Sequence, residues 1–118
     1  MREKSNPIGN IYISPRAIAT IAYFSALETY GLVGLAAKSL AEDLANVLVK
    51  DPTLGVDVDF KGGSVNVDLY IIVEYGTRIT SVAASAAASV RYQIEKATGL
   101  SVGDVNIHVR GLRISNPD

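Results

Sequence analysis

The chain has 118 residues, of which 48% are hydrophobic and none is cysteine. This length suits one domain with a sizeable core, and the lack of cysteine excludes a disulfide scaffold, a thiolate metal site and a cysteine nucleophile. The net charge of −1 and the pI near 5.8 argue against a nucleic-acid binder, because such proteins normally carry a basic excess.

The N-terminus is charged and no apolar run follows it, so we expect neither a signal peptide nor a transit peptide. Every apolar stretch is far shorter than the roughly 18 residues that a membrane span needs. We therefore expect a cytoplasmic protein. Residues 1–8 are predicted to be a flexible N-terminus, 9–115 a single domain and 116–118 a tail.

The first half of the chain predicts a strand followed by two helices. Asn10–Ile13 has the pattern of a short strand, and Ser14-Pro15 is a typical helix start for a helix that reaches about residue 30. The following Gly-Leu-Val-Gly is predicted to be a tight connection. A capping-box pattern then predicts a second helix at about 40–50.

The second half predicts a hairpin, a helix and a strand. Apolar residues alternate over 56–60 and 65–73, and Gly62-Gly63 between them indicates a two-residue turn. A helix is expected over 79–98, followed by a strand over 105–110. The predicted fold is an α+β two-layer sandwich of order β-α-α-β-β-α-β, with helices on one face of a mainly antiparallel sheet.

A two-residue turn would place Asp57 directly opposite Asp68, and like charges in that position are destabilising. We expect Arg110, Arg113 or a bound cation to offset the repulsion, unless the face is simply solvated. A metal-dependent hydrolase using these two carboxylates and Asp59 is a further alternative.

The chain contains one histidine, His108, which alternates with apolar residues and is therefore expected on the polar face of its strand. A lone histidine without cysteine cannot build a typical zinc site, and nothing in the spacing suggests a catalytic triad. We predict no catalytic residue, no metal ligand and no cofactor.

An interaction surface is predicted from two features. Tyr70 and Ile72 lie on the strand face that should be polar, and exposed apolar side chains there suggest a contact surface. The helix at 79–98 is rich in small residues, so a partner could approach one of its faces closely. That face consists of Ser81, Ala84, Ser85 and Ala88. The alternative is that alanine serves there only as a good helix former.

The tetrapeptide Gly31-Leu32-Val33-Gly34 has the GxxG form that joins two helices and clamps nucleotide backbone in KH domains. An RNA-binding module of KH-like topology is therefore the alternative function. However, Leu32 and Val33 are apolar, so the segment is also compatible with a helix cap followed by a buried anchor.

Four segments resemble one family in their order and spacing. They are 68–76 (Asp-Leu-Tyr-Ile-Ile-Val-Glu-Tyr-Gly), 30–34 (Tyr-Gly-Leu-Val-Gly), 98–100 (Thr-Gly-Leu) and 105–109 (Val-Asn-Ile-His-Val). They are similar to the alkaline shock protein family of bacterial envelope stress response proteins, over about 9–116. The absence of long hydrophilic extensions suggests a compact housekeeping-type member.

The resemblance implies a bacterial cytoplasmic protein with no catalytic residue to carry over. Some members of that family self-assemble and reach the membrane through a membrane-anchored partner, and others are linked to lipid metabolism. We therefore expect a non-enzymatic adaptor or regulator in envelope stress or lipid homeostasis. Its expected partners are further copies of itself and a protein that is membrane-anchored or a lipid-metabolism enzyme, without nucleic acid.

Overall fold

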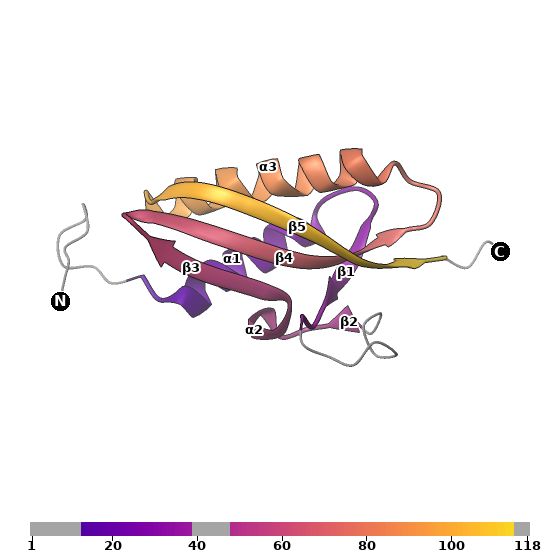
Figure 1. Ribbon diagram of the computed structural model, residues 1–118, viewed down its shortest axis with the longest axis horizontal. Coiled ribbons are helices and arrows are strands. Elements are labelled where there is room, and N and C mark those ends of the chain that lie inside the picture. The colour runs from indigo at the N-terminus through magenta and orange to yellow at the C-terminus, as the bar shows by residue number, and fades with distance from the viewer. Residues whose placement is uncertain (1–12, 39–47, 115–118) are drawn as a thin grey trace.

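The computed structural model describes residues 13–38 and 48–114. Their elements, in chain order, are α1 (Pro15–Leu27), β1 (Leu32–Ala36), β2 (Leu48–Val49), α2 (Pro52–Gly55), β3 (Val56–Lys61), β4 (Ser64–Glu74), α3 (Ile79–Thr98) and β5 (Ser101–Arg113) (Figure 1).

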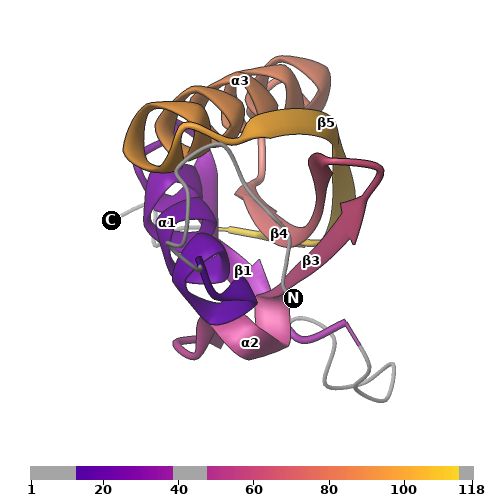
Figure 2. The same ribbon diagram turned by 90° about the vertical axis from the view of Figure 1, so that its left-hand side faces the viewer.

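Strand β4 is the centre of the sheet. It pairs antiparallel with β3 and β1 and parallel with β5, and β1 pairs antiparallel with the short β2. Figure 2 shows α1 and α3 together on one side of this sheet. The predicted α+β class, with helices on one face of a mainly antiparallel sheet, is confirmed.

The core forms where β4 faces the helices. Alternate residues of β4, from Val65 to Val73, are at most 1% exposed, and they pack against the buried stripes of α1 and α3. The principal helix residues in that contact are Ile18, Ala22, Ala26, Val82, Ala86, Val90 and Ile94. Burying each large apolar side chain contributes about 1.5–3 kcal/mol, so this face of the sheet fixes where both helices lie.

The β3–β4 hairpin has the register that its turn predicts. Gly62 and Gly63 both have positive φ values, 56° and 86°, which a two-residue hairpin turn requires. Asp57 is consequently paired with Asp68. The predicted opposition of these two carboxylates is confirmed.

The start of α1 and the end of α3 follow local rules. Ser14 accepts a hydrogen bond from the Ala17 N–H at 3.0 Å, and Pro15 occupies the first turn, as predicted for the start of α1. Helix α3 ends at Gly99, whose φ of 77° is the left-handed conformation expected of a terminating glycine.

The prediction that residues 31–34 connect two helices is wrong, because Leu32–Ala36 is a strand. Leu32 and Leu35 are buried and pair with β4, so the apolar content of this segment is used for sheet pairing. The KH-like arrangement of helix, GxxG loop and helix is therefore absent from the described part of the chain.

Two further predicted elements fall mainly outside the described residues. The strand expected at Asn10–Ile13 lies there except for Ile13, and so does most of the helix expected at about 40–50. The end of that helix is corrected, since Leu48–Val49 is a strand and Asp51 caps the short helix α2. No helix within 13–38 or 48–114 is long and apolar enough to cross a membrane.

Candidate functional site

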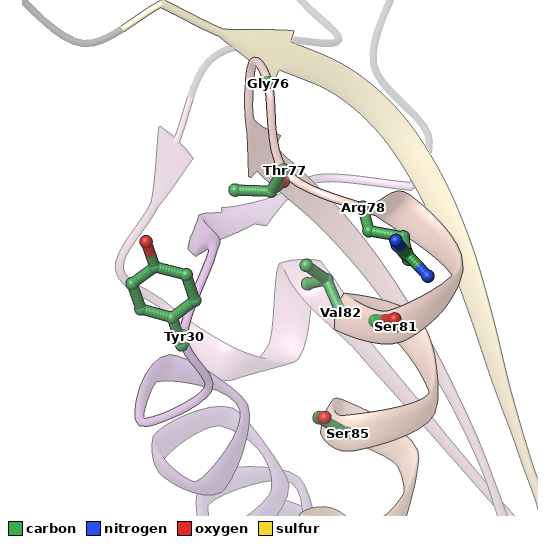
Figure 3. A pocket seen from close by; sticks show the side chains of 7 residues that line it. All are labelled: Tyr30, Gly76, Thr77, Arg78, Ser81, Val82 and Ser85. Carbon is green, nitrogen blue, oxygen red and sulfur yellow. The ribbon is translucent and has the colours of Figure 1, made fainter.

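A pocket of about 330 Å³ lies between the end of α1 and the start of α3. Its walls are formed by Tyr30, Gly76, Thr77, Arg78, Ser81, Val82 and Ser85. Figure 3 shows Tyr30 on one side and the α3 residues on the other. The Tyr30 side chain is 90% exposed, which makes it the most exposed of the large apolar side chains described.

The Tyr30 wall is set by the turn after α1. The helix ends at Leu27, and Gly31 has a φ of 89°, so the chain reverses directly after Tyr30. A side chain at Gly31 would meet the Val82 side chain at 2.8 Å, which shows how closely this turn approaches α3. Glycine at 31 therefore permits the close approach of the two walls.

The opposite wall depends on the turn between β4 and α3. Thr77 donates its N–H and its hydroxyl to the Glu74 carbonyl at 3.2 and 2.7 Å, and Gly76 has a φ of 94°. Arg78 is the N-cap of α3 but makes no side-chain cap hydrogen bond, and the first turn carries no acidic residue. The pocket mouth thus combines hydroxyls, a cation and uncompensated helix N–H groups, which favour a polar or anionic group on a partner.

Helix α3 exposes the four small residues that the sequence indicated. Ser81, Ala84, Ser85 and Ala88 are all exposed. Ser81 and Ser85 line the pocket opposite Tyr30. The structure therefore brings two of the four predicted residues together with an aromatic side chain that sequence reasoning missed. No pattern in the sequence indicates Tyr30 as a contact residue, because the exposure of a residue after a helix depends on how the turn folds.

Tyr70 and Ile72 do not join this surface. Tyr70 is half-buried and its ring stacks on that of His108, with centroids 4.6 Å apart and planes 12° apart. Ile72 is 1% exposed, so the prediction that it is an exposed contact residue is wrong. Strand alternation identifies the face on which a side chain lies, but not whether other parts of the chain cover that face.

The Asp57–Asp68 pair is offset by Lys38 and by a polar contact with His108, but not by the predicted arginines. Lys38 Nζ lies 2.6 Å from Asp57 Oδ2, and His108 Nε2 lies 3.0 Å from Asp68 Oδ1. The hydrogen bond to Asp57 raises the pKa of the Lys38 ammonium above its ordinary value. Arg110 and Arg113 form no ion pair with the described residues.

This polar strip offers little for metal chemistry. Within residues 13–38 and 48–114, no three or more His, Asp or Glu side chains form a group that could hold a metal ion. Asp59 pairs loosely with Lys61 at 3.9 Å instead of joining Asp57 and Asp68. The carboxylates of the sheet are thus engaged by separate partners from β5, from β3 itself and from the end of β1.

Three relatives match nearly the whole chain. "Uncharacterized protein YloU" of Bacillus subtilis (strain 168) is 41% identical over 111 residues, which is 92% of either chain. "Uncharacterized protein Spy1614" of Streptococcus pyogenes serotype M6 is 32% identical and covers 90% of this chain and 89% of its own length. "Uncharacterized protein YqhY" of Bacillus subtilis is 30% identical, with 96% and 84% covered.

Solved structures support the fold alone. The structure "MamM CTD - Copper form" has a TM-score of 0.52 at 10% sequence identity and covers 88% of this chain and 92% of that chain. Another MamM CTD structure has a TM-score of 0.51 at 11% identity, with 83% and 98% covered. At such low identity, what binds to MamM CTD does not transfer to this chain.

A family model covers residues 3–114, almost the full length. It describes the alkaline shock protein 23 family, with cell envelope-related function. The resemblance inferred from the four sequence segments is thereby confirmed. The chain belongs to the alkaline shock protein 23 family, whose function is related to the cell envelope.

Proposed function

We propose that this chain is a cytoplasmic, non-enzymatic adaptor or regulator in cell-envelope stress or lipid homeostasis. It acts by binding a protein partner and by associating with further copies of itself. The partner is a membrane-anchored protein or an enzyme of lipid metabolism. Family membership supports the link to the envelope, and the surface around Tyr30 supports protein contact as the mode of action.

The supporting observation is the combination of an exposed aromatic ring with a wall of small residues. Tyr30 is 90% exposed, and tyrosine is enriched at protein interfaces because it offers a large rigid apolar area with a hydroxyl. Ser81 and Ser85 present little bulk across the pocket, so a partner side chain could enter beside the ring. Arg78 also lines the pocket and adds a positive charge for an acidic or polar group of that partner.

The test is affinity capture from the native host, with the soluble and membrane fractions kept apart and each treated with and without nuclease. Tyr30→Ala and Ser85→Arg remove the ring and fill the pocket. Ala97→Arg is the matched control, because Ala97 is also exposed on α3 but lies twelve positions beyond Ser85 and does not line the pocket.

We expect an envelope or lipid-metabolism protein that is retained with or without nuclease, lost in both pocket variants and kept in Ala97→Arg. Partners that vanish with nuclease would contradict the proposal and indicate nucleic-acid binding. If wild type and both pocket variants retain the partner equally, the pocket is not the site at which the partner binds.

A further inference from the structure

Strand β5 is long and is paired along one edge only. Its thirteen residues, Ser101–Arg113, run beside β4, and no other strand in the described part of the chain pairs with it (Figure 1). Apolar side chains near this edge remain exposed, with Val109 at 40% and Leu112 at 46%. Unpaired edges of this kind readily accept another strand unless charge, proline or cover prevents it.

Side chains of α3 cover the beginning of this edge. Arg91 donates to the Val102 and Gly103 carbonyls at 2.6 and 2.8 Å, and Glu95 accepts from the Val102 N–H at 3.1 Å. The backbone groups of Val102 therefore point outward, away from β4. These contacts end at Gly103, and from Asp104 onward no side chain of the described residues forms a hydrogen bond with the outer edge of β5.

The orientation of the following residues can be derived from the register with β4. Val102 pairs with Val65 and Val105 pairs with Val67, two positions on, so the backbone of Val105 also points outward. Strand alternation extends this orientation to Ile107 and Val109. These three residues would supply the donors and acceptors for a further strand.

The sequence of β5 is nearly palindromic around Ile107. It reads Val-Gly-Asp-Val-Asn-Ile-His-Val-Arg-Gly-Leu over 102–112. In an antiparallel pair of two such strands centred on Ile107, Val105 faces Val109 of the other copy and Gly103 faces Gly111. Apolar residues thus meet apolar residues, and the two glycines at the register shifts of β5 coincide.

The charged side chains of β5 are also complementary in the register centred on Ile107. Asp104 of one copy would face Arg110 of the other, so the pair would occur twice across the two-fold axis. Neither side chain makes an ion pair with the described residues, so both are available. Opposite charges placed directly across two strands are stabilising.

The neighbouring helix leaves room for the second copy. Helix α3 packs against β5, and Ala84 and Ala88 lie seven positions before Arg91 and Glu95, on the side of α3 that faces the β5 edge. Small residues there allow the α3 helices of two copies to lie side by side at the usual interhelical distance of about 8–10 Å. We propose that two copies of this chain join by antiparallel pairing of β5 with β5, in the register centred on Ile107.

This proposal rests on the self-association part of the proposed function, and its test is independent of partner capture. The mass of the purified full chain is measured by light scattering across a range of concentrations. The chain has no cysteine, so single cysteines can report the register. Ile107→Cys faces itself in the proposed pair, with Cα atoms about 5.5 Å apart, within disulfide range.

Val109→Cys is the matched control, since the two copies of residue 109 would be about 13 Å apart along the strands and could not be bridged. A charge exchange tests the same register without oxidation. Arg110→Asp or Asp104→Arg alone should raise the dimer dissociation constant about tenfold or more. The double exchange should restore it to within about threefold of wild type.

We expect a dimer that Ile107→Cys traps on oxidation and Val109→Cys does not. A monomer at every concentration would overturn the proposal, while partner capture through the Tyr30 pocket could still succeed. A dimer that both cysteine variants trap equally, or that the double exchange fails to restore, would also overturn the pairing at β5.

Discussion

Replacing Gly31 by alanine tests how closely the turn after α1 approaches α3. The φ of 89° at this position costs a residue with a Cβ about 1–2 kcal/mol. The added Cβ would also lie 2.8 Å from a Val82 methyl group, and overpacking of that kind costs about 1–3 kcal/mol. We therefore expect Gly31→Ala to lower the free energy of unfolding by about 3 kcal/mol.

Gly99→Ala is the matched control. Gly99 has a similar φ of 77°, but a Cβ built there meets nothing within 4 Å. The backbone cost and the entropic gain of removing a glycine are therefore common to both variants, and their difference reports the contact with Val82. Urea unfolding of the three proteins measures this difference. If the two alanine variants lose the same free energy within about 0.5 kcal/mol, the close approach at Gly31 is refuted.

Three further changes test the correction at Ile72, the anchoring of β2 and the cap of α2. Ile72→Ala should cost about 2–5 kcal/mol in urea unfolding because the side chain is 1% exposed, and a loss below about 1 kcal/mol would show that it is exposed after all. Tyr23→Phe should cost about 1–2 kcal/mol, since the Tyr23 hydroxyl donates to the Val49 carbonyl at 2.8 Å; an unchanged urea midpoint would argue against this bond. Hydrogen bonds from the N–H and then the hydroxyl of Thr53 hold the pKa of Asp51 below its ordinary value of 3.8. A lowered pKa stabilises the fold above the unfolded value, so Asp51→Asn should lower the thermal midpoint at pH 7, and the difference should shrink as the pH falls through and below about 3.8; a constant difference would contradict the assignment.

The sequence predicts those parts of the fold that local rules determine. Gly62-Gly63 fixes the hairpin turn, and the turn fixes the opposition of Asp57 and Asp68. Ser14-Pro15 and Gly99 mark helix ends because caps depend on a few neighbouring residues. In each case, the residues that decide the structure lie within a few positions of one another.

The predictions from sequence fail where contacts between segments far apart in the chain determine the structure. Residues 31–34 have the pattern of a connection, but Leu32 pairs with Val73 of β4, some forty positions away, and this pairing makes the segment a strand. Ile72 alternates onto the polar face but is buried there. Lys38 reaches Asp57 only because the end of β1 lies near β3. Hydrophobic periodicity and helix-capping patterns depend on neighbouring residues, so neither can predict such long-range contacts.

Packing within one copy explains part of the near-palindromic sequence of β5. The part that such packing does not explain supports the pairing of two copies. Val105 and Ile107 pack against the core, and the glycines lie beside the register shifts, so packing within the monomer accounts for these features. Packing does not account for Asp104 and Arg110 standing at equal distances from Ile107. Their charge exchange is therefore the sharper test of pairing. If pairing holds, each dimer presents two Tyr30 pockets, and a partner with two matching sites, or two partners held at one membrane, would bind with increased avidity.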